Sequence, residues 1–170
     1  MGSNTSSAHA RAVLDGIRRI VQALRESSRA AEKHAGLSGA QLFVLRAVAD
    51  APGLSLNDLA ERTRTHQSSV STLVTRLAAD GLLERSTATG DARRAEIRLS
   101  SVGRRRLRRA PHAAQERLVA AVDAMPASQR ARLGVLLGGV VRAMGLPARR
   151  PAMFFEDSAS RSARKRRTHA

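Results

Sequence analysis

Residues 66–81 read HQSSVSTLVTRLAADG and carry two stripes of opposite character at helical spacing. One stripe is apolar and repeats at i, i+3, i+4, i+7 and i+8, the pattern of a helix face buried in a core. It consists of Val70, Leu73, Val74, Leu77 and Ala78. The other starts two residues earlier, which places it about 200° around the helix and opposite the core. It consists of Ser68, Ser71, Thr72, Thr75 and Arg76. The stretch therefore predicts a helix with a buried face and a hydroxyl-rich outer face.

The composition of the outer stripe indicates its use. Solvent-facing helix positions are usually filled by good helix formers such as Glu, Lys, Gln or Arg, whereas Ser and Thr are mediocre there. Short hydroxyl side chains let a helix lie close to base edges and phosphates in the major groove of DNA. No acid interrupts the stripe before Asp80, and Gln67 and Arg76 have a longer reach. We expect a DNA-contacting face; a solvent face rich in Ser and Thr is the alternative.

A basic hairpin is expected directly after this helix. The stretch STATGDARRAEIRLSSVG (86–103) has a Gly-Asp tip and then strict alternation of apolar and charged residues, which is typical of a half-buried strand. Following a recognition helix, such a hairpin is a wing, with Arg93 and Arg94 placed to contact a minor groove or the backbone. We expect Asp91 to brace Arg93. The alternative is a solvated turn with incidental arginines.

The segments before and after this unit are predicted to be helical. Ser55 and Asp58 have the spacing of a helix start, so a short helix precedes the break at 63–65 and completes a helix-turn-helix. Further helices are expected over 8–34, 40–49, 101–126 and 128–145. Two of them carry long apolar stripes. The stripe of the helix over 8–34 consists of Val13, Ile17, Ile20 and Leu24. The stripe of the helix over 128–145 consists of Leu133, Leu136, Leu137, Val140, Val141 and Met144. The predicted fold is mainly α with one small β-hairpin.

Composition narrows the class of function. Among 170 residues, 30 Lys and Arg face 14 acidic residues for a net charge of +16, which favours a nucleic-acid partner. The aromatic share of 2% argues against stacking on single strands, so duplex DNA is preferred. The absence of Cys excludes a disulfide framework and a thiolate metal site. We find no signal peptide, membrane span, or enzyme motif, and expect a cytoplasmic, non-enzymatic protein without a cofactor.

Together these features resemble the winged helix-turn-helix of the multiple-antibiotic-resistance regulator (MarR) family. The matching pieces are LSGAQLFVLRAVA (37–49), the run RLAADGLLER (76–85), and a wing of the form Asp-x-Arg followed by L-S-x-x-G at 99–103. The resemblance covers roughly residues 10–145 and implies a homodimer that binds a pseudo-palindromic operator, usually as a repressor released by a small ligand. By position, Asp91 and Arg93 match the family's wing pair. Ala92 stands where members often have Arg, so Arg94 is the alternative source of that contact.

The resemblance also implies a domain layout within one domain over 1–170. Residues 8–34 and 104–145 would form dimerisation helices, 38–103 the winged helix-turn-helix, and 147–170 a basic tail. In the tail, MFF (153–155) is a candidate latch onto the dimer layer. The run RSARKRR (161–167) is a candidate for non-specific phosphate contacts, with a solvated terminus as the alternative.

The effector is the least determined part of the prediction. Effectors of the family are often phenolic or aromatic carboxylates, bound between the dimer layer and the winged domain. Arg18, His34 and Arg46 lie on or beside the first two predicted helices and are candidate ligands for such an anion, although each is also an ordinary surface residue type. None of the five His pairs at i, i+4, so no metal site is expected. The alternative function is a non-specific architectural or nucleoid DNA-binding protein.

Overall fold

The computed structural model describes the backbone of residues 2–88, 91–147 and 153–154, and the side chains within these ranges except those of 2–6 and 87–95. Its elements are α1 (Gly2–Ala35), α2 (Gly39–Asp50), α3 (Leu56–Arg62), α4 (Gln67–Ala79), β1 (Leu83–Ala88), β2 (Asp91–Leu99), α5 (Ser101–Arg108), α6 (Ala114–Asp123) and α7 (Ala127–Ala143). The prediction of a mainly helical chain with one hairpin is confirmed.

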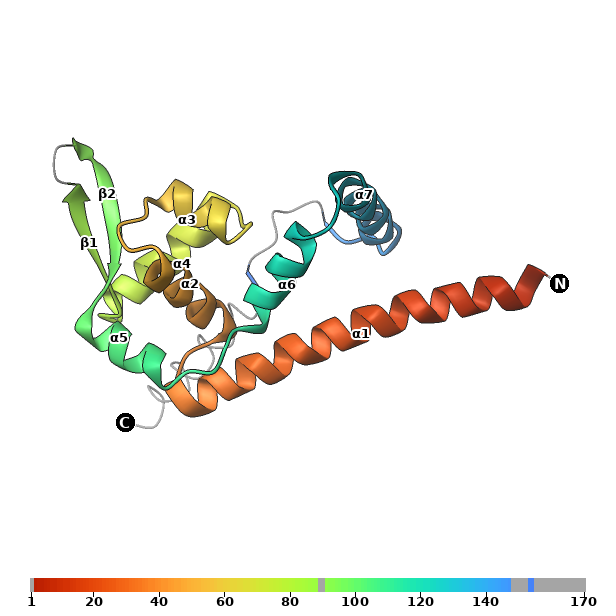
Figure 1. Cartoon of the computed structure of the whole chain (residues 1–170), viewed down its shortest axis with the longest axis horizontal. Coiled ribbons are helices and arrows are strands. Elements are labelled where there is room, and N and C mark those ends of the chain that lie inside the picture. Colours follow the sequence, from red (N-terminus) through yellow and green to blue (C-terminus); the bar gives the residue numbers. More distant parts are fainter. Residues whose placement is uncertain (1, 89–90, 148–152, 155–170) are drawn as a thin grey trace.

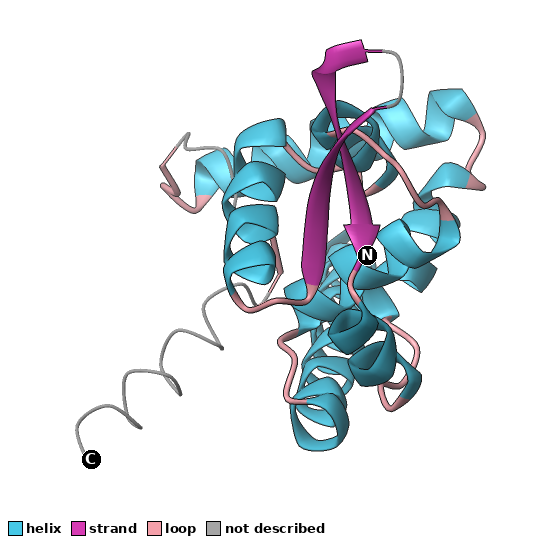
Figure 2. Cartoon of the chain, turned by 90° about the vertical axis from the view of Figure 1, so that its left-hand side faces the viewer, coloured by secondary structure: helices cyan, strands magenta, loops and turns pink. Residues whose placement is uncertain are grey.

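The elements fall into a winged unit and a set of helices that extend from it (Figure 1). The winged unit comprises α2 to α5 with the β1–β2 hairpin, which projects beyond the helices (Figure 2). Helix α1 contacts α2 and α6 near its C-terminal end, and its N-terminal part runs away from the winged unit. Helix α7 follows α6 at the side of the molecule away from the hairpin.

The core sits in the winged unit and is built around α2. Leu42, Val44, Leu45 and Val48 of this helix are completely buried. The inner face of α4 packs into the same apolar cluster, together with Leu59 of α3. Because each fully buried Val or Leu side chain contributes roughly 1.5–3 kcal/mol, this cluster fixes the orientation of α4 and therefore of its outer face.

Two helix starts follow the expected local chemistry. The Ser38 hydroxyl accepts the Gln41 N–H at 3.2 Å, and the Gln41 side chain accepts the Ser38 N–H at 2.9 Å. Ser55 and Asp58 form the same reciprocal pair at the start of α3, with distances of 3.2 and 3.1 Å. Such capping boxes satisfy backbone donors that a helix start leaves without an intrahelical partner. The predicted beginnings of both helices are therefore confirmed.

The hairpin is joined to the helices along its inner face. Its register pairs Leu83 with Leu99 and Arg85 with Ile97. Ile97 is buried and also exchanges backbone hydrogen bonds with the α2–α3 loop: its N–H donates to Leu54 O at 2.9 Å, and its carbonyl accepts from Gly53 N at 3.0 Å. This loop therefore anchors the base of the wing.

The L-S-x-x-G run at 99–103 has a defined structural role. Ser100 caps α5, because its hydroxyl accepts the Gly103 N–H at 2.9 Å and donates to Gly81 O at 2.6 Å. Gly103 is buried against the backbone of Leu82, and an added Cβ would overlap the Leu82 carbonyl oxygen. The run thus fastens α5 to the segment between α4 and β1.

One predicted helix is wrong in extent. Instead of a single helix over 101–126, the chain forms α5 and α6 with a break between them. Pro111 lies in the break, where its missing N–H and its steric restriction of Ala110 oppose helix continuation. Helix α5 contacts α2 and β2, so it packs within the winged unit.

Helices α1 and α7 leave apolar faces uncovered in the single chain. In α1, the exposed fractions are 57% for Val13, 37% for Ile17 and 44% for Ile20. In α7, Leu136 is 59% exposed and Val140 is 44% exposed, and no residue of this helix is buried. Within the described residues, none of the helices has the length and apolar character needed to cross a membrane.

Candidate nucleic-acid interface

The two faces of α4 lie as the spacing predicts. Val70, Leu73, Val74 and Leu77 are buried, and Ala78 is half-buried. The outer face carries the residues predicted to contact DNA. Gln67, Ser68, Thr72, Thr75 and Arg76 are exposed, and Ser71 is half-buried. The helix therefore presents a row of small polar side chains to the outside, while its role in base contact stays a prediction.

The threonine hydroxyls on this face are oriented by the helix itself. Thr72 Oγ1 donates to the Ser68 carbonyl at 3.0 Å, and Thr75 Oγ1 donates to the Ser71 carbonyl at 2.9 Å. Such bonds to the i−4 carbonyl use the hydroxyl proton and leave oxygen lone pairs as acceptors. In this arrangement Thr72 is suited to accept from a base amino group in the major groove.

Arg85 is a further basic residue beside the outer face, and sequence reasoning did not single it out. It lies on β1, and its Nη2 donates to Thr75 Oγ1 at 3.2 Å across the gap between wing and helix. In the run LLER (82–85), Arg85 follows the buried leucine pair by two positions, and this basic residue directly after the predicted recognition helix was the available signal. Its position joins the positive charge of the wing to the hydroxyl stripe of α4.

The predicted wing residues lie only partly within the described structure. The backbones of Asp91, Arg93 and Arg94 belong to β2, but their side chains and residues 89–90 lie outside the described part. The brace between Asp91 and Arg93 stays a prediction. So does the DNA contact that Arg94 would make in place of the arginine missing at Ala92.

The turn between α3 and α4 is hydrogen-bonded to the C-terminal end of α6 through Arg64. Arg64 adopts a φ of 51°, the left-handed region, which costs a residue with a Cβ roughly 1–2 kcal/mol. Its Nε and Nη2 donate to Asp123 Oδ2 at 3.3 and 3.2 Å. Arg130 at the start of α7 also approaches Asp123, with Nη1 at 3.8 Å from Oδ1. One carboxylate therefore links the helix-turn-helix to α6 and α7.

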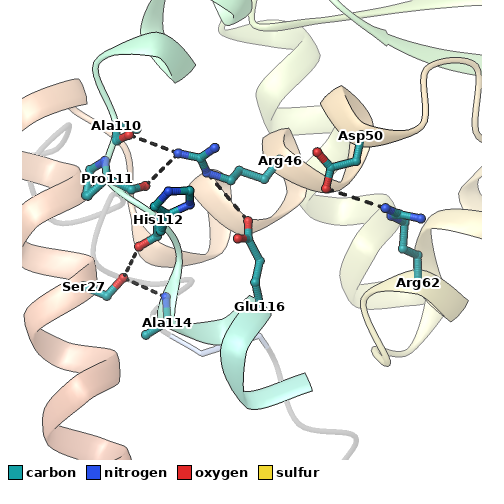
Figure 3. Close-up of polar contacts among 9 residues, drawn as sticks. All are labelled: Ser27, Arg46, Asp50, Arg62, Ala110, Pro111, His112, Ala114 and Glu116. Atoms are coloured by element: carbon teal, nitrogen blue, oxygen red, sulfur yellow. Dashed lines mark hydrogen bonds and ion pairs between the residues drawn. The ribbon is translucent and has the colours of Figure 1, made fainter. Parts of the chain in front are cut away.

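Arg46 connects α2 to the segment between α5 and α6 (Figure 3). Arg46 of α2 donates through Nη2 to the carbonyls of Ala110 and Pro111, both at 3.1 Å. Its Nε lies 3.7 Å from Glu116 Oε1. Burial raises the pKa of the Glu116 carboxyl above its ordinary value, an effect that the Arg46 charge opposes. Arg46 is therefore committed to contacts within the chain.

The three candidate ligands for an effector are not gathered in one place. Arg18 is exposed and pairs with Asp15 at 2.7 Å within α1. His34 is exposed in the last turn of α1. Arg46 lines a hollow between α2, β2 and α5 that shares no lining residue with the hollow at Arg18. Their predicted role in binding an anion is not tested by this arrangement.

A separate apolar cavity of about 340 Å³ lies where α2, α6 and the α3–α4 turn meet. Its lining consists of Phe43, Thr63, Arg64, Thr65, His66, Gln115, Leu118, Val119, Val122, Met153 and Phe154. The described part of the MFF run thus contacts α6, a helix of the expected dimer layer, and Met153 also enters the core of the winged unit. Phe155 and the basic run at 161–167 lie outside the described residues. Among those described, no three His, Cys, Asp or Glu side chains are grouped to hold a metal ion.

Comparisons with known proteins agree with this architecture. The model of the MarR family matches residues 35–94, which span α2 to the start of β2. A search of curated proteins finds no match. Among solved structures, the transcriptional regulator BldR from Sulfolobus solfataricus is 21% identical, with a TM-score of 0.51 over 85% of this chain and 99% of that one.

Two further solved structures share the fold. BpsR from Bordetella bronchiseptica is 23% identical, with a TM-score of 0.51 over 77% of this chain and 91% of its own. A MarR family transcription regulator is 15% identical, with a TM-score of 0.55 over 84% of this chain and 94% of its own. At these identities the structures show the fold alone. The likeness to the MarR family therefore rests on the match of its family model to residues 35–94.

Proposed function

We propose that this protein is a homodimeric, sequence-specific repressor that binds a pseudo-palindromic DNA operator in the cytoplasm and is released by a small aromatic or phenolic acid. One observation carries the proposal: the outer face of α4 is an exposed row of hydroxyl side chains, held opposite a buried face. Arg85 adds a cation beside that row, and the whole chain carries a net charge of +16. A major groove lined by base edges and phosphates complements this surface.

The uncovered faces of α1 and α7 support the dimer. A second copy related by a two-fold axis would cover them with the same faces, as isologous interfaces do. On this proposal, residues 8–34 and the part of 104–145 that follows α5 contribute the dimerisation helices. Residues 38–103 form the DNA-binding unit, into which α5 (Ser101–Arg108) also packs. Two copies of α4 would then read two half-sites, which is why a pseudo-palindromic operator is expected.

The proposed effector class draws on the cavity and on a solved relative. The BpsR structure is described as explaining the regulation of its DNA binding by 6-hydroxynicotinic acid, an aromatic acid. In this chain, the cavity of about 340 Å³ falls in the size range of small-molecule sites and adjoins the start of α4. Both points support a regulator whose DNA affinity a small aromatic acid changes.

Selection of bound genomic fragments, followed by competition with bulk DNA, tests the proposed function. A specific regulator binds its best site about 10³-fold or more tightly than bulk DNA at physiological salt. A ratio near one would overturn the repressor proposal and favour the architectural alternative. The selected site is then used to screen small aromatic acids for release.

Arg93→Ala is expected to weaken binding to the selected site and to lower the salt dependence. If each of the two Arg93 side chains of a bound dimer neutralises one phosphate, the magnitude of the slope of log K against log salt falls by about 1.8, because each phosphate contributes about 0.9. Fluorescence anisotropy across a salt series measures both quantities. As a control, Arg132→Ala removes the same charge from an exposed position of α7 and should leave the affinity and the salt slope unchanged. A wild-type salt slope for the Arg93→Ala protein would contradict a phosphate contact by the wing.

Thr72→Ala is expected to change the preference among operator variants. Loss of one accepted hydrogen bond should cost roughly 1 kcal/mol at the base pair that Thr72 contacts, and much less at other base pairs. Binding to a panel of single-base operator variants measures this, with Thr72→Ser as the control that keeps the hydroxyl. A uniform loss across the panel would contradict base reading by Thr72.

A further inference from the structure

An arginine-lined hollow lies within the winged unit, where α2, β2 and α5 contact one another (Figure 1). Its volume of about 480 Å³ falls in the size range of small-molecule sites. It shares no described lining residue with the apolar cavity beneath the α3–α4 turn. None of the described side chains predicted to contact DNA lines it either. The hollow is therefore separate from both sites considered so far.

The charge of this hollow is unbalanced. Its described lining includes Arg46, Arg98, Arg104 and Arg108 but no acidic residue. Arg98 pairs with the neighbouring Glu96 at 2.7 Å, and Arg46 is committed to the segment between α5 and α6. Within the described part of the chain, Arg104 and Arg108 have no acidic partner. Two guanidinium charges of the hollow therefore remain uncompensated.

Arg104 and Arg108 are four residues apart on α5, and both line the hollow. Nη1 of Arg104 donates to the Leu99 carbonyl at 2.7 Å, which holds this guanidinium at the junction of β2 and α5. Arg108 is exposed and makes no hydrogen bond or ion pair to another described residue. Like charges at this helical spacing repel each other. An anion bound between them would replace that repulsion with attraction to both guanidiniums.

The donors in the hollow favour phosphate groups. A guanidinium presents five N–H donors in a planar fork that matches the oxygens of a phosphate. Arg104 uses one of its donors on Leu99, and Arg108 uses none within the described residues. Two linked phosphates supply enough negative charge and enough acceptor oxygens for both arginines.

The rest of the lining favours a ligand that also has an organic part. Val48 and Ala49 of α2 and Leu107 of α5 supply apolar surface in the same hollow. An inorganic anion makes no use of this surface, whereas a flat organic group would bury apolar area against it. Arginine side chains also stack on flat rings.

We propose that this hollow binds an organic diphosphate of the nucleoside diphosphate class. Its phosphates would lie on Arg104 and Arg108, and its organic part on the apolar surface that α2 and α5 contribute. The site gives the protein a second class of small ligand, and it does not rest on the proposed function.

Calorimetric titration of the full-length protein with ADP at physiological salt tests the site. We expect one ADP bound per chain and no detectable binding of adenosine, which lacks the phosphates. Inorganic pyrophosphate lacks the organic part and should bind about tenfold more weakly than ADP. Absence of ADP binding up to millimolar concentration would overturn the site. Equal affinities for pyrophosphate and ADP would overturn the role of the apolar surface.

Arg108→Ala should weaken ADP binding about tenfold, because one charge-assisted contact to phosphate is lost. The substitution removes no contact to another described residue, so the variant should fold as the wild type does. Arg105→Ala is the matched control: it removes the same charge from an exposed position of α5 that does not line the hollow, and should leave the ADP affinity unchanged. Equal losses in both variants would show attraction to the basic chain as a whole and overturn the site.

The phosphates of DNA are the other source of this chemistry, and a DNA titration distinguishes them. Arg108→Ala should leave the affinity for the selected operator and its salt slope unchanged. A lower salt slope together with wild-type ADP affinity would overturn the diphosphate site and assign Arg108 to the DNA-contacting surface. ADP binding with the expected variant pattern supports the site even if the protein shows no sequence preference on DNA, so the two proposals fail separately.

Discussion

Replacing Gly103 by Ala is expected to lower the free energy of unfolding by about 3 kcal/mol, because an added Cβ overlaps the Leu82 carbonyl oxygen. That oxygen cannot move away cheaply, since it accepts the Ser100 N–H at 3.1 Å. The same substitution disturbs the Ser100 cap, whose hydroxyl accepts the Gly103 N–H. Urea unfolding followed by circular dichroism measures the change at a fixed protein concentration, because dimerisation would make stability depend on concentration.

Gly139→Ala is the matched control for this substitution. Gly139 lies in α7 but is not part of its apolar stripe, and an added Cβ there meets no heavy atom within 4 Å. Alanine is a better helix former than glycine by roughly 1 kcal/mol, so this variant should be at least as stable as the wild type. Equal stability of Gly103→Ala and wild type would show that α5 does not pack against Leu82 in solution.

Leu136→Asp is expected to convert a wild-type dimer into a monomer. Leu136 lies on the uncovered apolar face of α7, and burying an aspartate there in a two-fold interface places two like charges in an apolar contact. Light scattering should report a mass near that of the 18.2 kDa chain for the variant, and twice that mass for the wild type.

The loss of the dimer should also weaken operator binding by at least about 100-fold, because linked half-sites no longer act together. Ser128→Asp adds the same charge to the exposed first turn of α7 and should remain dimeric and bind as wild type. Retention of the dimer by Leu136→Asp would exclude this face of α7 from the interface. A monomeric wild type would contradict the proposed homodimer itself.

The amino-acid sequence determined the features that depend on local periodicity and local hydrogen bonding. The two faces of α4 follow from side-chain spacing alone, because residues three and four apart share one face of a helix. The start of α3 follows from Ser55 with Asp58 three residues later. The wing follows from the alternation around Ile97, which is buried as expected.

The tertiary structure alone decided the contacts between residues far apart in the chain. Arg64 meets Asp123, Arg46 meets the Ala110 and Pro111 carbonyls, and Gln115 holds Phe154. No spacing in the sequence specifies these pairs, because they form only after the apolar faces of several helices have packed and brought their polar edges together. The predicted helix over 101–126 was too long, because the chain breaks into α5 and α6 around Pro111. Its amphipathic pattern continues through Pro111, and the proline overrides that pattern through the steric limits of the backbone.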